Sequence, residues 1–452
     1  MNHSTALQDA VHAKTVDRDC VVESARRLPI RHDVDVVVCG AGPAGIGAAL
    51  AAAREGAEVL LVEQHGQPGG VWTAGLLNPF FECMGRGWIV DELVERLKTA
   101  GSLRPWMKSY TFDVEIMRLM LEQMLSEAGV ECLYYTMVTD AVVEDGRLRG
   151  VVLESKSGRE AVRARTVIDA TGDGDVAARA GCPYELGRPG DGFLQPMTLM
   201  FEIHGLGDWE HDNAPALFDK MSAAIERHDL DVKLPFGRVN YAPWIIATPT
   251  RGVSAVQATH VYGLNPLDPK DLTAGTCTCR RQAADMIKVF RHIPGLEGVR
   301  MGHTAAQLGI REARRVRGRY QLTRDDLVAG RRFEDAVASC AFVVDIHDPA
   351  ATVNTGWDDK ISIQPYEIPY GCLVPETVDG LLTAGRCISG SHEAHASYRV
   401  TGTAMATGQA AGLAAAWAAA ERCEVSAVPG RELKSALVAR GARMADTAEA
   451  SV

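Results

Sequence analysis

The pattern of apolar positions changes sharply near residue 35. Residues 1 to about 30 are polar and aperiodic, and we expect them to form a flexible arm. An apolar run over 36–39 then predicts a short buried strand. A glycine-rich stretch and helix-forming residues over 48–55 follow, and a second apolar run ends at Glu63. A strand, turn, helix and strand within about thirty residues have the size of one βαβ unit.

The rest of the chain alternates between helical and strand-like periodicity. Four short strand-like pieces between residues 131 and 162, separated by turn signals, predict a small antiparallel insertion. An arginine-dense stretch after residue 310 fits a helix. We expect helices over 111–128, 214–228, 271–292, 311–320 and 402–420, and further strands at 166–169, 198–203 and 341–345.

Length and composition narrow the class of protein. A chain of 452 residues is long enough for about two or three domains. The 47 Lys and Arg against 58 Asp and Glu give a formal net charge of −11, which disfavours a nucleic-acid partner. The 11 cysteines are scattered and form no Cys-x-x-Cys pair, which suits a reducing compartment without zinc or iron–sulfur clusters. With no signal-like N-terminus and no apolar stretch long enough to span a bilayer, we expect a cytoplasmic protein.

Many of the 44 glycines concentrate in motifs, the first of which is a dinucleotide fingerprint. Gly40-Ala41-Gly42-Pro43-Ala44-Gly45 follows a predicted strand and opens a predicted helix, the context that this fingerprint requires. The first glycine allows the tight turn, the second lets the backbone approach a pyrophosphate, and the third permits close helix packing. The helix start offers free N–H groups to phosphates, and Glu63 would accept hydrogen bonds from a ribose. The alternative is a glycine-rich turn in another α/β fold.

Several blocks of sequence together resemble one family. They are the first strand through Glu63, residues 69–80, residues 167–175 (Val-Ile-Asp-Ala-Thr-Gly-Asp-Gly-Asp), residues 309–315 and residues 380–412. The chain resembles the FAD-dependent oxidoreductases of the glutathione-reductase-like superfamily, in the branch that includes fumarate reductase and succinate dehydrogenase flavoproteins. The resemblance implies an α/β fold whose Rossmann-like FAD-binding domain is of glutathione-reductase type. We expect this domain to be discontinuous, with an inserted α+β domain: an arm at 1–30, the FAD-binding domain at 31–185 and 341–425, a substrate or cap domain at 186–340, and a C-terminal tail at 426–452.

The resemblance also implies which residues hold a non-covalently bound FAD. Gly69 and Gly70 would begin a loop that passes the phosphates and the flavin, and Val138 would lie against the adenine. Arg386 stands where an acidic residue often contacts the cofactor, and Asp173 is an alternative acidic group. The implied FAD site consists of Gly40, Gly42, Pro43, Ala44, Gly45, Glu63, Gln64, Gly69, Gly70, Val138, Ala170, Thr171, Gly172, Asp173, Gly385, Arg386, Gly402, Thr403 and Met405.

Candidate catalytic residues lie just before the last glycine-rich helix. Arg399 follows His395 by four residues, and in the fumarate reductase branch this spacing places the arginine over the flavin, where it binds a carboxylate and can donate a proton. The planar guanidinium suits a carboxylate. The helix that starts at Gly402 would direct its positive dipole end at the flavin. His392 and Tyr398 complete the candidate set, and for each histidine and for Arg399 a purely structural role is the alternative.

One further cluster has the residue types of a metal site. His347 lies between Asp345 and Asp348, but short-range acids around one histidine are more often a turn, and we predict no metal there. The sequence carries one dinucleotide fingerprint, which disfavours a separate NAD(P)H domain.

The sequence therefore predicts an FAD-dependent oxidoreductase of dehydrogenase or oxidase type. It would transfer a hydride between a small organic substrate and FAD, and electrons would pass to oxygen or an external acceptor. A flavin-dependent monooxygenase is one alternative, and a flavin-containing binding or scaffold protein without redox turnover is another. The resemblance also implies a homodimer.

Overall fold

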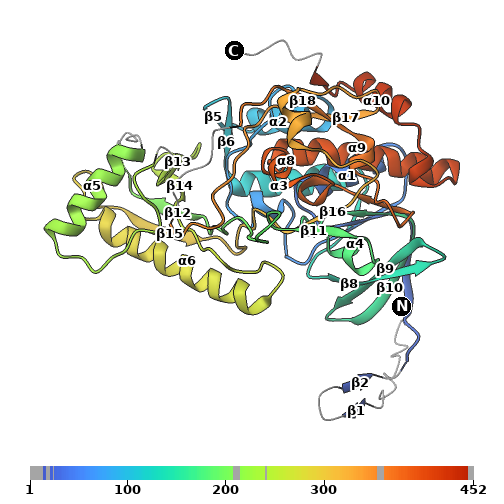
Figure 1. Ribbon diagram of the computed structural model, residues 1–452, viewed down its shortest axis with the longest axis horizontal. Coiled ribbons are helices and arrows are strands. Elements are labelled where there is room, and N and C mark those ends of the chain that lie inside the picture. Colours follow the sequence, from blue (N-terminus) through green and yellow to red (C-terminus); the bar gives the residue numbers. More distant parts are fainter. Residues whose placement is uncertain are drawn as a thin grey trace.

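The computed structural model describes residues 14–16, 21–23, 25–206, 214–239, 242–353 and 361–445. Figure 1 shows a larger lobe, which holds the early and late parts of the chain, and a smaller lobe from the middle of the sequence. Within the described residues, the larger lobe contains a seven-stranded sheet and the smaller lobe a four-stranded sheet. The chain leaves the larger lobe after β11 (Tyr184–Leu186) and returns with β16 (Arg314–Val316), and these two strands pair with each other.

Parallel strands dominate the centre of the large sheet. Side chains of its central strand, β3 (Ile30–Cys39), alternate between two buried faces. Val36 and Val38 belong to one apolar core, whereas Val37 and Cys39 belong to the other. The mixed α/β architecture with a parallel sheet is confirmed. The parallel strands are β7 (Glu131–Leu133), β4 (Val59–Val62), β3 (Ile30–Cys39), the second half of β10 (Gly158–Asp169) and β19 (Leu381–Thr383), neighbours in that order.

The predicted βαβ unit at the start of the sheet is also confirmed. Between β3 and β4 the chain forms α1 (Pro43–Arg54), which packs against α9 (Thr401–Glu421) (Figure 1). Small residues set this close packing, because a Cβ at Gly408 would lie 2.0 Å from the carbonyl oxygen of Ala44. One turn further along both helices, Gly412 meets Ala48 in the same way. The two helices therefore run parallel and start at the same end of the lobe.

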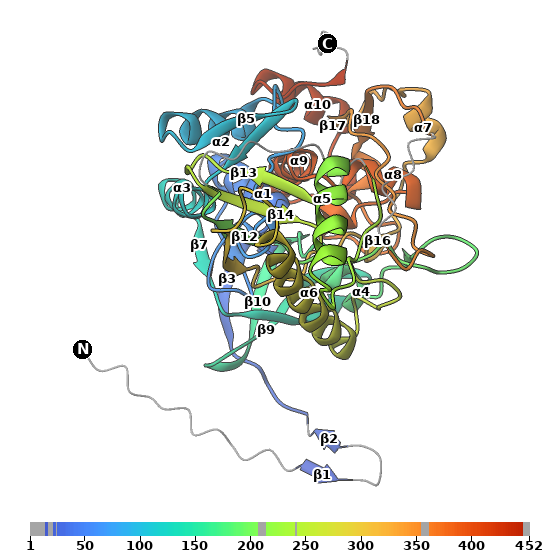
Figure 2. The same cartoon turned by 90° about the vertical axis from the view of Figure 1, so that its left-hand side faces the viewer.

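The smaller lobe is an antiparallel sheet covered by two helices. Its strands, in spatial order, are β13 (Trp244–Ala247), β14 (Val253–Gln257), β12 (Phe201–His204) and β15 (Arg300–Thr304). Phe201, Leu217 and Met286 share one core between sheet and helices. Figure 2 shows the helices beside the sheet. They are α5 (Ala214–Arg227) and α6 (Pro269–Phe290), which confirms the helices predicted over 214–228 and 271–292.

The arginine-rich segment 311–320 is not helical, which corrects the prediction for it. Its centre is β16, whose extended backbone sends successive side chains to opposite sides. Arg315 is buried and pairs with Glu312, whereas Arg314 Nη1 donates to Asp175 Oδ1 at 2.9 Å. Arg314 and Arg315 thus have separate carboxylate partners, as expected for side chains on opposite sides of a strand.

One further strand prediction needs correction. The strand predicted at 341–345 ends before that segment, because β17 (Ala336–Cys340) pairs with β18 (Tyr366–Pro369) and residues 341–346 are irregular. Val344 is buried although its backbone is irregular, and its apolar side chain led to the wrong prediction of a strand.

The insertion predicted between 131 and 162 is antiparallel only in part. β8 (Met137–Glu144) and β9 (Arg147–Ser155) pair antiparallel with each other and with the first half of β10. β7, however, is parallel to β4, and β10 continues without a break into the strand predicted at 166–169. The insertion is therefore an extension of the large sheet.

The remaining elements complete the larger lobe. Only part of the predicted arm is described, and its strands β1 and β2 form a pair that Figure 2 shows apart from the body. None of the helices in the described part of the chain is both long and apolar enough to cross a membrane. The other strands and helices are β1 (Lys14–Val16), β2 (Val21–Glu23), α2 (Trp88–Thr99), β5 (Leu103–Trp106), β6 (Ser109–Phe112), α3 (Val114–Glu127), α4 (Asp175–Arg179), α7 (Arg324–Val328), α8 (His392–Tyr398) and α10 (Gly430–Ala439).

Candidate functional site

A cleft opens at the carboxyl ends of the parallel strands of the large sheet. Residues that directly follow β3, β4, β10 and β19 line it. Parallel strands bring their carboxyl ends to one edge of a sheet, where open α/β sheets bind ligands. Of the predicted cofactor residues, the lining contains Gly40, Gly42, Pro43, Ala44, Glu63, Gln64, Gly70, Val138, Ala170, Thr171, Gly172, Asp173, Gly385 and Arg386.

The three fingerprint glycines differ in what surrounds them. A Cβ at Gly45 would lie 1.7 Å from the carbonyl oxygen of Gly40, so this position admits no side chain. Gly40 itself has φ of 99°, in the left-handed region. At Gly42 a Cβ would meet no protein atom within 4 Å, and this residue faces the cleft. The first and third glycines therefore shape the turn, whereas the second leaves space for a ligand.

Glu63 is fixed in the wall of the cleft by backbone hydrogen bonds. Its Oε2 accepts from the N–H of Ala41 at 2.8 Å, and its Oε1 accepts from the N–H of His65 at 2.8 Å. Each carboxylate oxygen can accept a further hydrogen bond. Glu63 thus ties the fingerprint to the end of β4 and keeps acceptor capacity for a ribose.

Two aspartates organise the turn that follows β10. Asp169 accepts from the N–H of Thr171 at 3.1 Å and from the N–H of Ala177 at 2.9 Å, which joins the turn to α4. Asp173 pairs with Arg386 across the cleft wall. Burial raises the pKa of Asp173, although Arg386 opposes this shift. An ion pair therefore occupies the position where the resemblance implied a lone acidic group.

Some predicted cofactor residues do not line the cleft. The N–H of Gly69 donates to the carbonyl of Ala41 at 2.7 Å, which holds the loop that begins at Gly69 against the fingerprint. Gly402 donates to the carbonyl of Phe81 at 2.9 Å, and Thr401 and Ala404 of the same helix line the cleft instead. Direct FAD binding stays a prediction for all of these residues. Those that do not line the cleft are Gly45, Gly69, Gly402, Thr403 and Met405.

The four candidate catalytic residues occupy different environments. Arg399, which ends α8, lines the cleft, and its Nη2 donates to Asp345 Oδ2 at 2.6 Å. The hydroxyl of Tyr398 donates to the carbonyl of Ile388 at 2.8 Å, and this side chain is buried. Both ring nitrogens of His395 are buried without a partner among the described residues. Burial and the nearby charge of Arg315 lower the pKa of His395.

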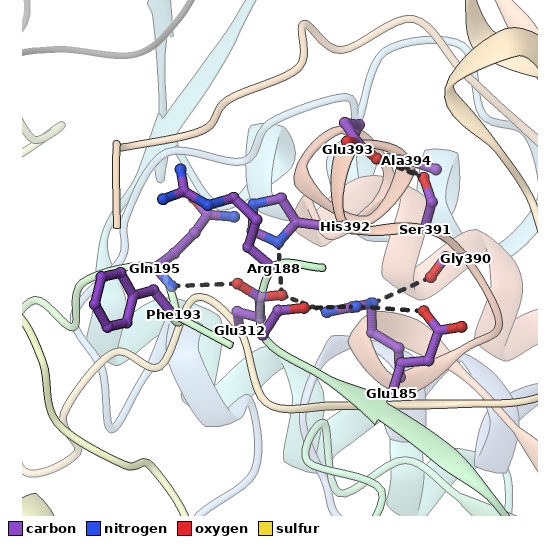
Figure 3. A network of polar contacts seen from close by, with 12 residues as sticks. Glu185, Arg188, Phe193, Gln195, Glu312, Gly390, Ser391, His392, Glu393 and Ala394 are labelled. Atoms are coloured by element: carbon purple, nitrogen blue, oxygen red, sulfur yellow. Dashed lines mark hydrogen bonds and ion pairs between the residues drawn. The ribbon is translucent and has the colours of Figure 1, made fainter. Parts of the chain in front are cut away.

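His392 belongs to a buried polar network behind the cleft. Figure 3 shows its ring directed at Glu312, and Nδ1 lies 2.9 Å from Oε1 of that carboxylate. The same carboxylate pairs with Arg315 and accepts from the N–H of Gln195 at 3.2 Å. Arg315 also donates to the carbonyl of Gly390 at 3.1 Å. The network joins α8 to the strand that enters the larger lobe, so it positions the segment that carries Arg399.

A second polar cluster meets Arg399 at the junction of the two lobes. His347 Nε2 lies 3.2 Å from Asp345 Oδ1, on the side of the carboxylate not used by Arg399. The ring centroids of His347 and His260 are 5.5 Å apart. Arg311 Nη2 lies 3.4 Å from His260 Nε2, and its Nη1 donates to a carbonyl and a threonine hydroxyl just before β12. Side chains from both lobes therefore gather around one carboxylate.

Electrostatics fix the charge states in this cluster. Burial alone would raise the pKa of Asp345, but its contacts with His347 and Arg399 hold it well below its ordinary value. Burial and the charge of Arg311 lower the pKa of His347, and the same two causes lower that of His260. Burial and the neighbouring Arg399 lower the pKa of Arg311 to about 10. At neutral pH the carboxylate is therefore ionised and both histidines are neutral.

A known family model matches most of the chain. The model of the FAD dependent oxidoreductase family matches residues 35–437. The chain belongs to this family. Its cofactor is FAD, and its fold is of the Rossmann-like, dinucleotide-binding kind.

Curated relatives match a limited part of this FAD-dependent oxidoreductase. A thiamine thiazole synthase from Aeropyrum pernix is 35% identical over 158 residues, which cover 32% of this chain and 57% of the relative. Digeranylgeranylglycerophospholipid reductase 1 from Methanopyrus kandleri is 33% identical over 149 residues, which cover 31% of this chain and 40% of the relative. The chain thus spans 40% to 57% of the length of these relatives.

Solved structures resemble the chain over most of its length. A geranylgeranyl bacteriochlorophyll reductase-like protein from Thermoplasma acidophilum matches with a TM-score of 0.47 and 14% identity, covering 91% of this chain and 85% of that protein. A triple mutant of the flavin-dependent brominase Bmp2 matches with a TM-score of 0.48 and 16% identity, covering 90% and 84%. The family assignment rests on the family model rather than on these structures.

The polar atoms of the cleft fit FAD. Buried groups normally find hydrogen-bond partners. Several lining residues nevertheless carry buried polar atoms with no partner among the described residues. FAD, with hydroxyls and phosphates along its length, can satisfy such groups, and the open position at Gly42 leaves room for it. The unpartnered atoms are His65 Nε2, Gln307 Oε1, Arg386 Nε, Arg399 Nε and Thr401 Oγ1.

Sequence reasoning missed several residues of the site. Gln307 and Arg179 line the cleft without belonging to any fingerprint. Arg311 was one of a run of arginines, and nothing in the pattern set it apart from the others. Asp345 and His347 carried a signal, since acids flank the histidine, but the signal pointed to a turn or a metal. His260 had no sequence signal.

Proposed function

We propose that this protein transfers a hydride between a small organic substrate and non-covalently bound FAD, and that the electrons then pass to oxygen or an external acceptor. One observation carries the proposal: Arg399 lines the FAD cleft and is held by Asp345, beside His347 and residues of the smaller lobe. Such convergence of charged groups from two lobes at a cofactor cleft is typical of an active site.

Arg399 orients the substrate in this proposal. Asp345 fixes one end of the guanidinium through its carboxylate and, at 3.0 Å, its backbone carbonyl. The buried Nε–H of Arg399 has no partner among the described residues and is available to a carboxylate or another polar group. When bound, FAD supplies the hydride acceptor or donor.

The histidines of the second cluster handle protons in this proposal. His347 shares the Asp345 carboxylate with Arg399, so a substrate held by Arg399 lies near its ring. A neutral imidazole can take a proton from a substrate hydroxyl or amine as the hydride leaves. We assign His392, His395 and Tyr398 to positioning α8 and Arg399, because all three are buried and none of them lines the cleft.

Finer assignments follow from the resemblance and remain proposals. They are the glutathione-reductase type of the FAD-binding domain, the fumarate reductase and succinate dehydrogenase branch, and the dehydrogenase or oxidase type of reaction. On the same resemblance we propose a homodimer and the division at residues 186–340, and on the scattered cysteines of the sequence we propose a cytoplasmic location. The part of the predicted division that falls on residues 1–13 and 446–452 lies outside the described residues.

Anaerobic mixing of the purified holoprotein with carboxylic acids, amines, alcohols and unsaturated acids tests the proposal. We expect one class to bleach the oxidised flavin, or to reoxidise reduced flavin, at a rate that saturates with concentration. Absence of any response across the panel would favour the scaffold alternative. NAD(P)H consumption stimulated by a substrate in air would favour a monooxygenase.

A further inference from the structure

Four aromatic rings form a continuous row where the two lobes meet. Each ring meets the next edge to face, with centroids 5.3 to 5.7 Å apart. All four side chains are half-buried, so part of each ring faces solvent. A single apolar side chain on a surface is ordinary, but a contiguous apolar patch usually marks a binding site. This aromatic row consists, in order, of Phe342, Phe81, Trp106 and Trp244.

Both lobes contribute to the aromatic row. Trp106 is the last residue of β5 in the larger lobe, and Trp244 is the first residue of β13, an edge strand of the smaller sheet. Thr111 Oγ1 donates to the carbonyl of Ala247 at 2.8 Å, so β6 and β13 lie side by side at the junction (Figure 1). Met107, which follows Trp106, is 75% exposed and adds to the apolar surface. The row therefore lies at the same junction of the lobes as the polar cluster around Arg399.

One end of the row is attached to the backbone on either side of Arg399. The hydroxyl of Ser397 donates to the carbonyl of Phe342, and the N–H of Gly402 donates to the carbonyl of Phe81 at 2.9 Å. The carboxylate partner of Arg399 lies on the same irregular segment as Phe342. Two rings of the row are thus held by the segments that hold the arginine, so one molecule can contact both.

We propose that the substrate is a carboxylic acid that carries an aromatic group, and that this group lies on the aromatic row while Arg399 holds the carboxylate. This inference rests on the proposed function, which places the substrate at Arg399. Among the described residues of the cluster, Arg399 and Arg311 bring two positive charges against the single negative charge of Asp345, which favours an anion. Aromatic groups pack edge to face or offset on other rings, which adds to the gain from apolar burial.

Two other uses of the row make different predictions. A row that binds a second copy of the chain would make the oligomeric state depend on its rings. A row that only joins the two lobes would affect the stability of the protein, but it would give no preference for aromatic ligands.

The test measures how matched acids bind to the holoprotein, by titration calorimetry. We expect phenylpropionate and phenylbutyrate to bind about tenfold more tightly than propionate and butyrate, because only the first two bury a ring. In Trp106→Ala this preference disappears, whereas the affinity for the short acids stays at the wild-type value. Trp417→Ala is the matched control, because Trp417 is half-buried on α9 and outside the row, and it keeps the full preference. No preference in the wild type, an undiminished preference in Trp106→Ala, or a changed sedimentation coefficient in that variant would overturn the proposal.

Neutral analogues separate this inference from the proposed function. Phenylpropanol and propanol lack the carboxylate, so their relative affinity reports on the row without Arg399. If Arg399 does not bind the substrate, acids bind no more tightly than alcohols, yet the preference for the ring persists in both pairs. If the row is not the site, neither pair shows the preference, although acids still bind more tightly than alcohols. Should Trp106→Ala fail to fold, Phe342→Leu keeps an apolar side chain without the ring, and an unchanged preference in this variant would contradict the proposal.

Discussion

The guanidinium of Arg399 and the carboxylate of Asp345 meet with 2.6 Å between Nη2 and Oδ2, although the two residues are 54 positions apart in the chain. Arg399 lies at the C-terminal end of α8, and Asp345 lies in the irregular segment after β17. Because Arg399 also lines the cleft where we expect FAD to bind, this ion pair links the cleft to the polar cluster at the lobe junction. The proposed chemistry depends on this contact.

Substitution of the arginine by lysine tests the orienting role. A lysine keeps the charge but lacks the planar fork, so it cannot hold Asp345 and a substrate at once. In Arg399→Lys we expect bound FAD at the wild-type ratio of flavin to protein, and flavin reduction by substrate slowed about hundred-fold or more. Anaerobic stopped-flow absorbance gives the rate. Arg317→Lys serves as the control, because Arg317 is 55% exposed and outside the cleft. An unchanged rate in Arg399→Lys would remove Arg399 from the site.

The two fingerprint glycines at 42 and 45 should respond differently to a methyl group. Gly45→Ala forces a Cβ to within 1.7 Å of the Gly40 carbonyl oxygen, so we expect a large loss of folded protein. Gly42→Ala meets no protein atom and should fold, but its methyl group occupies space that the cofactor needs. We therefore expect a folded protein with weakened FAD binding. Circular dichroism and the flavin-to-protein ratio separate the two results, and full FAD occupancy in Gly42→Ala would contradict this account.

Neutralising Asp345 should destabilise the protein. Asp345→Asn leaves Arg399 and Arg311 close together in a buried cluster without their carboxylate. Breaking a buried ion pair from one side typically costs about 3–5 kcal/mol. We expect a loss toward the lower end of this range in the free energy of unfolding, measured by urea titration. Asp33→Asn removes an exposed pair with Arg163 and should change little, whereas a similar loss in both variants would argue against the buried cluster.

The stability of the folded protein should fall as the pH falls below the pKa of a free histidine. Burial lowers the pKa values of His260 and His395 in the folded protein, whereas the unfolded chain binds protons near pH 6.5. The unfolded state then takes up more protons, so stability is complete above about pH 6.5 and declines toward lower pH. The carboxylate of Asp345 acts in the same direction, but only below about pH 4.

A variant that cannot titrate isolates the histidine contribution. His395→Phe replaces a buried ring without partners by an apolar ring of similar shape, so we expect a smaller loss of stability between about pH 6.5 and 5. His303→Phe, at a ring that is 57% exposed on β15, should keep the wild-type pH dependence. Unfolding by urea at several pH values measures both. A wild-type stability that does not change over this range would contradict the assignment of buried neutral histidines.

Local motifs predicted the turns that line the cleft, because each motif specifies a local backbone shape. The spacing of Gly40, Gly42 and Gly45 requires a turn between a strand and a helix, whatever the rest of the fold. The end of a parallel strand is likewise visible as an apolar run that stops at Glu63 or Asp169. Once such ends are recognised, the topology of a parallel sheet brings them to the same edge.

The substrate side could not be predicted in the same way. His260, Arg311 and Asp345 come from three separate segments, and their proximity results from how the two lobes pack. The arginine-rich stretch was predicted as a helix because pairing between β11 and β16, which connects distant parts of the chain, leaves no periodic signal. The partner of a buried charge is set by tertiary contacts rather than by neighbouring residues.

The most direct test of the central claim is anaerobic flavin reduction in the wild type and in Arg399→Lys, with the same substrate panel and equal FAD content. We predict that one substrate class reduces the bound flavin of the wild type rapidly and that of the variant about hundred-fold more slowly. Equal rates in the two proteins, or purified protein that neither carries FAD nor takes it up, would contradict the account.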